Sequence, residues 1–223
     1  IFEKEGSPDI LYLFNGKTYP ENIISLWAEE NNVKIRYFES GVFENSLFFS
    51  DNFAASAIFN FDKSEKNDLS KINDLLNSKI KSKKDPYNMV SWGRKDEFQN
   101  DLYTKRFSIF LNLPYDTSQI DADIVFDDIY GWIDELLVQF TKFPQYLFLF
   151  NIHPGIYDPK RPSREGLKRY IKKRIKNIKN CYLRDPKFSV STYQILLNSD
   201  GVLTYNSTVG LEARLLKIPI LEA

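Results

Sequence analysis

The second half of the chain alternates short apolar runs with segments of helical spacing, and this order constrains the fold more than any other feature. Apolar runs start at residues 107, 146, 181 and 202, helical patterns separate them, and a last apolar run follows a helix that starts near 209. Strands that alternate with helices are typical of an open α/β sheet with parallel strands. We therefore predict an α/β fold for residues 107–223.

The start of the chain shows the same order on a smaller scale. Residues 9–14, DILYLF, contain a short apolar run that ends at an Asn-Gly turn, and a helical pattern follows from Pro20. Alternating apolar residues over 33–37 predict a second strand. A strand, helix and strand in this order imply a crossover between parallel strands. We predict a second α/β domain here.

Polar and charged residues dominate between these two regions, with one amphipathic helix over 69–80. We predict three parts: residues 1–61 are the remainder of an N-terminal α/β domain, 62–106 are a helical linker, and 107–223 are a C-terminal α/β domain. The chain starts without Met and stops directly after an apolar run. We therefore expect the pair of domains to be truncated at both ends.

Composition argues against several classes of protein. The 30 basic and 30 acidic residues cancel, and no nucleic-acid-binding motif is recognisable, so we expect no nucleic acid as partner. The single cysteine, Cys181, predicts a packed thiol in a reducing compartment. One His and one Cys exclude a zinc site, and the glycine-rich phosphate loops of NTPases and dinucleotide enzymes are absent. No apolar window approaches the ~20 residues of a membrane span.

Ligands of open parallel sheets bind beyond the carboxyl ends of the strands, so the residues that follow each apolar run are the candidates for a site. These residues are Asn15, Gly16, Glu39, Ser40, Gly41, the segment 114–116, His153, Pro154, Gly155, Asn206, Ser207 and Thr208.

Each candidate has a functional and a structural interpretation. His153 can donate to a phosphate oxygen, or it is an ordinary loop histidine. Ser207 and Thr208 precede a helix, where they can hold a phosphate or cap the helix. Glu212 on that helix can accept from sugar hydroxyls or complement the helix dipole. Glu39 ends a strand, where partial burial would raise its pKa towards that of a general base; otherwise it is a solvated acid.

A basic segment over 160–180 contains ten Lys or Arg residues and one Glu. Its apolar residues have helical spacing, so the basic residues cover the opposite face. Such a face is commonly just solvated, and it can also attract anionic lipid headgroups or an acidic polymer.

Three stretches together resemble a known family. They are "FNGKTYPENIISLWAEENNVKIRYFESG", "NIHPG" and "LLNSDGVLTYNSTVGLEARLLKIPILEA", and they are similar to the bacterial capsule polysaccharide synthesis proteins, glycosyltransferases with the GT-B fold of two Rossmann-like domains. The His-Pro and Ser-Thr motifs resemble those that hold the phosphate of CMP-sugars in Kdo transferases and bacterial sialyltransferases.

The resemblance implies a metal-independent, inverting transfer from a nucleotide-sugar to a polysaccharide or glycolipid acceptor, with no cofactor, in the cytoplasm or at the inner face of its membrane. It implies that residues 107–223 bind the donor through His153, Pro154, Gly155, Asn206, Ser207, Thr208 and Glu212. It assigns Glu39 as the catalytic base, and Asn15, Gly16, Lys17, Ser40 and Gly41 to the acceptor side. Two alternatives stay open: a CDP-glycerol glycerophosphotransferase of the same fold, and a non-catalytic glycan-binding or assembly subunit.

Overall fold

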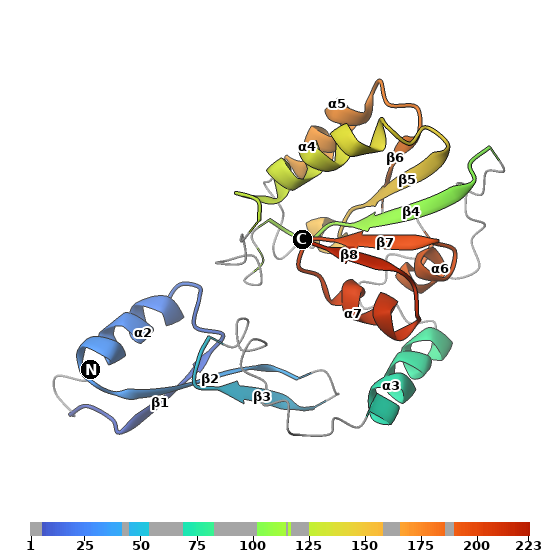
Figure 1. Cartoon of the computed structure of the whole chain (residues 1–223). Helices are drawn as coiled ribbons and strands as arrows, with labels where there is room; N and C mark the ends of the chain where they lie inside the picture. Colours follow the sequence, from blue (N-terminus) through green and yellow to red (C-terminus); the bar gives the residue numbers. More distant parts are fainter. Residues whose placement is uncertain are drawn as a thin grey trace. The chain divides into compact units, whose positions relative to one another are not determined.

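The computed structural model of the chain describes residues 6–41, 45–53, 69–82, 102–114, 116, 125–157, 166–185 and 190–223. These residues belong to two compact units, Ile1–Leu69 and Ser70–Ala223 (Figure 1).

Unit 1 contains the predicted strand, helix and strand. They are β1 (Ile10–Phe14), α2 (Glu21–Glu30) and β2 (Lys34–Ser40), and β1 pairs parallel with β2. A third strand, β3 (Leu47–Ser50), pairs antiparallel with β2, so the sheet has the order β1-β2-β3. Leu13 and Tyr37 form the buried centre of this sheet.

Unit 2 is built on a five-stranded sheet in which every pairing is parallel. Its strands are β4 (Lys105–Phe110), β5 (Tyr146–Asn151), β6 (Cys181–Arg184), β7 (Gly201–Thr204) and β8 (Ile220–Glu222). The strand order is β6-β5-β4-β7-β8. The chain therefore adds strands on one side of β4 first and then returns to its other side, which makes the sheet doubly wound.

Two layers of helices cover this sheet, as Figure 1 shows. The helices α4 (Ile129–Phe140) and α5 (Leu167–Ile175) pack on one face, and α6 (Thr192–Leu197) and α7 (Thr208–Leu215) on the other. Successive residues of β4 point to opposite faces of the sheet. Ile109 belongs to the core under α4 and α5, and Phe110 to the core under α6 and α7. Strands buried on both faces explain why the apolar runs in the sequence are nearly continuous.

Side chains cap the starts of α4 and α6. The Asp128 carboxylate accepts from the N–H of Gly131 at 2.8 Å and starts α4. Ser191 and Gln194 form a reciprocal capping box at the start of α6. These caps satisfy backbone donors that a helix start leaves unpaired.

The remaining described helix is α3 (Leu69–Ser82), which confirms the helix expected over 69–80. Most of the predicted linker, 62–106, lies outside the described residues, so the three-part division stays a prediction. Among the described residues no helix is long and apolar enough to cross a membrane.

Candidate functional site

In unit 1, the carboxyl ends of β1 and β2 bring Asn15 and Glu39 together. Phe14 and Phe38 are partners in the parallel register, so the residues that follow them are neighbours. The Asn15 amide donates to Oε2 of Glu39 at 2.6 Å, and the Asn15 N–H donates to the carbonyl of Phe38 at 2.8 Å. Asn15 is 2% exposed, whereas Glu39 is half-buried. The amide therefore orients a carboxylate that solvent can still reach.

Gly16 and Lys17 complete the turn after β1. The φ of Gly16 is 93°, and a Cβ at this position would overlap the ring of Tyr37, so only glycine fits. The Lys17 N–H donates to Oδ1 of Asn15 at 3.4 Å, and its ammonium lies 6.0 Å from the Phe53 ring centroid. This tight turn holds the Asn15 side chain against Glu39.

Ser40 and Gly41 continue from the end of β2. The Ser40 N–H donates to Oε1 of Glu39 at 3.3 Å, so both carboxylate oxygens have a donor. The Gly41 N–H donates to the carbonyl of Ser46 at 2.8 Å and directs the chain towards β3. The structure thus places Glu39 and all five predicted acceptor-side residues at one edge of the unit 1 sheet.

In unit 2, the predicted donor residues follow β5 and β7, which lie on either side of β4. Between β4 and β7 the direction of strand addition reverses, and ligands of doubly wound sheets bind beyond the carboxyl ends at such a point. His153, Pro154 and Gly155 follow β5, and Asn206, Ser207 and Thr208 follow β7. The six residues therefore share this edge.

His153 is half-buried, and its ring is oriented by the backbone. The N–H of Gly155 donates to Nδ1 of His153 at 3.0 Å. Burial lowers the pKa of His153 below its ordinary value of 6.5, and the charge of Asp116 opposes this shift in part. The neutral ring then carries its proton on Nε2, because Nδ1 acts as the acceptor. Nε2–H is thus a defined hydrogen-bond donor at the edge of the sheet.

A short 3₁₀ helix, η3 (Pro154–Tyr157), supports this orientation. A Cβ on Gly155 would lie 2.8 Å from Nδ1 of His153 and 3.0 Å from Cδ1 of Leu113, so the glycine lets the backbone approach the ring.

Asn112 connects two strand ends at the edge of the unit 2 sheet. Its side-chain amide donates to the carbonyl of Asn206 at 3.0 Å, and its Oδ1 accepts from the N–H of Leu113 at 2.9 Å. Asn206 has a φ of 45°, a conformation that Asn adopts more readily than most residues. Asn112 was not among the residues predicted from the sequence. Its position directly after an apolar run was the signal that could have identified it.

Ser207 and Thr208 start α7. Ser207 is the N-cap residue, and its hydroxyl accepts from the N–H of Val209 at 3.4 Å. The structural interpretation of Ser207 as a helix cap is therefore confirmed. The start of a helix also presents N–H groups and a partial positive charge that favour a phosphate, so the cap and a phosphate site are compatible.

Glu212 lies on α7 and is held by a neighbouring helix. Its Oε1 accepts from the hydroxyl of Tyr193 on α6 at 2.9 Å. Burial raises the pKa of Tyr193, and the Glu212 carboxylate raises it further, so the phenol stays protonated. This contact orients the Glu212 carboxylate.

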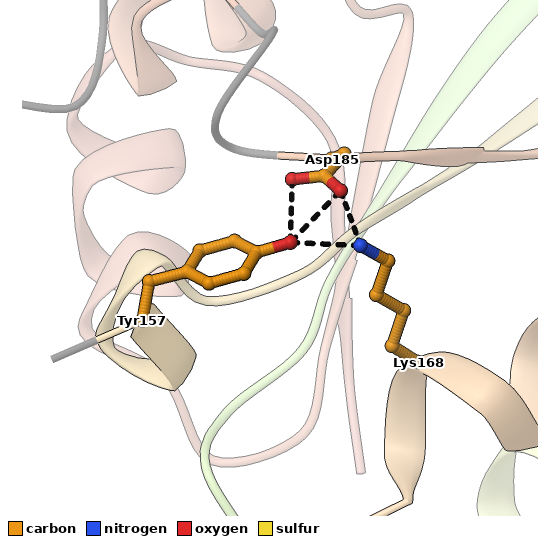
Figure 2. Close-up of polar contacts among 3 residues, drawn as sticks. All are labelled: Tyr157, Lys168 and Asp185. Atoms are coloured by element: carbon orange, nitrogen blue, oxygen red, sulfur yellow. Dashed lines mark hydrogen bonds and ion pairs between the residues drawn. The ribbon is translucent and has the colours of Figure 1, made fainter. Parts of the chain in front are cut away.

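A polar cluster that was not predicted from the sequence lies where η3, β6 and α5 meet (Figure 2). The Tyr157 hydroxyl donates to the Asp185 carboxylate, with distances of 2.9 and 2.8 Å to its two oxygens. The Lys168 ammonium donates to the Tyr157 hydroxyl at 2.8 Å and forms an ion pair with Asp185. Lys168 was one of the residues expected on the basic face of its helix, and its charge is instead compensated inside this cluster.

The rest of the basic segment does form an exposed face on α5 and its C-terminal end. Arg174 is paired with Asp134 at 2.8 Å, but within the described ranges four other exposed basic residues of α5 and its C-cap have no ion pair or hydrogen bond through their side chains. We call them the α5 basic face: Arg169, Lys172, Lys173 and Lys176. Their spacing of three and four residues places them on one side of the helix. Residues 160–165 of the segment lie outside the described residues.

Comparison with protein-family models gives no match, and comparison with curated protein sequences gives none either. Two solved structures of Thermosulfurimonas dismutans KpsC are similar in fold. The beta Kdo 2,4 transferase matches with a TM-score of 0.64 and 14% identity over 96% of this chain and 67% of that chain. The beta Kdo 2,7 transferase matches with a TM-score of 0.54 and 16% identity over 99% of this chain and 66% of that chain.

The protein thus spans about two thirds of the length of these two structures. At such identities the likeness shows the fold alone, and the predicted α/β fold with Rossmann-like, GT-B-type units is confirmed. These matches concern the fold and do not test the site residues, whose roles stay predictions.

Proposed function

We propose that the protein is a glycosyltransferase that moves a sugar from a cytidine-activated donor to a surface polysaccharide or glycolipid acceptor. The observation that carries the proposal is the edge of the unit 2 sheet. There, the fixed Nε2–H donor of His153 and the start of α7 flank the end of the central strand β4. Both groups suit a donor phosphate.

In the proposed reaction, the acceptor hydroxyl oxygen forms a bond to the anomeric carbon while the bond from that carbon to the phosphate oxygen breaks. Glu39 accepts the proton of the hydroxyl, which is the role of a general base. The negative charge that develops on the departing nucleotide is stabilised by His153 Nε2–H and by the N–H groups at the start of α7. The other predicted residues serve in binding: Pro154, Gly155, Asn206, Ser207, Thr208 and Glu212 on the donor side, and Asn15, Gly16, Lys17, Ser40 and Gly41 on the acceptor side.

The donor side is tested by thermal unfolding with CMP, CDP, UDP and GDP, on the wild type and on His153→Ala. We expect CMP to raise the melting temperature of the wild type and not of the variant. Stabilisation by CDP and not by CMP would favour the CDP-glycerol alternative. Stabilisation by UDP or GDP alone would refute the cytidine assignment, and no stabilisation at all would favour a non-catalytic subunit.

The proposed base is tested by Glu39→Gln, which keeps the shape and an acceptor for Asn15 but removes the basic carboxylate. We expect the transfer rate to fall by about 10²–10⁴, the usual contribution of a general base. Glu30→Gln, at an exposed position of α2, is the control and should leave the rate unchanged. An unchanged rate in Glu39→Gln would remove Glu39 from the reaction.

We also propose that the α5 basic face contacts anionic lipid headgroups and holds the protein at the inner face of the cytoplasmic membrane. Four cations on one side of a helix attract such a surface through charge alone. No inserted helix is then needed for this contact.

A further inference from the structure

We propose that Tyr157, Lys168 and Asp185 are positioning residues that hold His153 in one tautomer, with the ring proton on Nε2. The three side chains fix the end of η3 (Figure 2). The same short helix carries Gly155, whose N–H donates to Nδ1 of His153. The inference deepens the proposed function, because it names the residues that prepare His153 for a phosphate. The part of the inference that concerns the His153 tautomer does not depend on which ligand binds.

The path from the cluster to His153 is short and covalent. Only Pro154, Gly155 and Ile156 lie between His153 and Tyr157 in the chain, and the N–H of Ile156 donates to the His153 carbonyl at 3.2 Å. Ile156 also packs against the core that includes α4 and α5. Because η3 is short and packed against the core, a displacement of the Tyr157 ring should also displace the Gly155 N–H.

The charges of the cluster favour a structural link over a second ligand site. The hydrogen bond to Asp185 raises the pKa of Lys168, and burial raises the pKa of Tyr157. At neutral pH one ammonium therefore pairs directly with one carboxylate, and a neutral phenol is hydrogen-bonded to both. The phenol donates to the carboxylate and accepts from the ammonium, so the hydroxyl is used in both directions.

The chain offers a direct probe, because His153 is its only histidine. In protein labelled with ¹⁵N-histidine, the two ring nitrogens have separate shifts when one is protonated and the other is an acceptor. We expect wild type near pH 7.5 to show a bare Nδ1 and a protonated Nε2. In Tyr157→Phe the ring remains but its hydroxyl is lost, and the shifts should move towards those of a mixture of tautomers. Binding of CMP should weaken about tenfold, which corresponds to one hydrogen bond of ~1.4 kcal/mol.

Tyr170→Phe is the matched control, because Tyr170 lies on α5 and its hydroxyl contacts Arg174 at 3.0 Å rather than η3. The control should keep the wild-type shifts. Asp185→Asn is the second variant if Tyr157→Phe does not fold, since it removes the charge and keeps an acceptor. Wild-type shifts in a folded Tyr157→Phe or Asp185→Asn protein would overturn the inference. Absence of CMP binding to the wild type would instead count against the proposed function, and the shifts would still decide on the tautomer.

Discussion

His153 connects protonation to stability as well as to the proposed donor site. Its pKa in the folded protein lies below the 6.5 of an ordinary histidine, because burial disfavours the charged ring. As pH falls below about 6.5, the unfolded chain therefore binds the proton before the folded chain does, and this lowers the free energy of unfolding. His153 thus contributes stability at neutral pH that is lost on acidification.

The variant His153→Asn removes this contribution. We expect the free energy of unfolding, measured by urea titration, to decline less between pH 7.5 and pH 5 in the variant than in the wild type. The carboxylates titrate in both proteins, so the difference between the two declines isolates the histidine. Equal declines would show that the ring titrates alike in the folded and unfolded states.

Cys181, the only cysteine, provides a measure of unfolding. It is 4% exposed at the start of β6, as expected of a packed thiol, and burial raises its pKa to about 12. At pH 8 only about 10⁻⁴ of such a thiol is ionised, compared with about one quarter of a free cysteine. We expect a disulfide reagent such as DTNB to label Cys181 only as fast as the surrounding core opens, and much faster in urea. Rapid labelling of the native protein would contradict this burial.

At the scale of elements, we predict that the α5 basic face determines the affinity of the protein for anionic membranes. Each basic residue near an anionic surface contributes about 1 kcal/mol. Reversal of two charges, in Lys172→Glu combined with Lys173→Glu, should therefore weaken binding to phosphatidylglycerol vesicles by at least about thirtyfold. Sedimentation of the protein with vesicles measures this affinity.

The matched control reverses Lys34 and Lys105, two exposed lysines on strands. It changes the net charge equally and should bind the vesicles far more strongly than the α5 variant. Wild-type binding should also weaken between 0.1 M and 0.5 M salt, because salt screens exposed charges. Equal loss in both double variants would assign the effect to net charge rather than to this face.

Most elements were predictable from the sequence because their signals are local. The apolar run of β5 is buried on both faces, and the apolar spacing of α4 matches one side of a helix. Two elements were not predicted. β3 has only four residues, alternately exposed and half-buried, and its place is decided by pairing with β2. η3 is a single turn that depends on contacts beyond its own residues.

The sequence predicted only those residues of the candidate site that directly follow a strand. That rule identified His153 and Ser207, but it could not identify their supports. The Asn112 amide reaches the Asn206 carbonyl 94 positions away, and the Tyr157 hydroxyl reaches Asp185 28 positions away. The order of strands in the sheet decides which residues become such partners, and hydrophobic periodicity along the chain does not predict that order.

At the scale of the whole molecule, a bound nucleotide should act on one unit. We expect hydrogen exchange with CMP at 100 times its Kd to slow in unit 2 around residues 111–113, 152–157 and 205–210. Binding at this concentration stabilises the folded state by about 2.7 kcal/mol, so segments that exchange through unfolding should slow about a hundredfold. The β1 and β2 segments should exchange as without ligand. Protection confined to unit 1 would contradict the donor assignment, and His153→Ala should abolish the effect in unit 2.

The strand order of unit 2 also has a consequence for protein synthesis. β4 is the first strand of its sheet to leave the ribosome, and β5 and β6 can pair on one side of it as they emerge. Its other side pairs with β7, which follows much later, since Arg106 and Asp200 at the start of that contact are 94 positions apart. Until then the nascent chain carries an open apolar strand edge, the kind of surface that templates aggregation. We therefore expect a chaperone to be most needed after β4 and before β7 is synthesised, while the edge of β4 is unpaired.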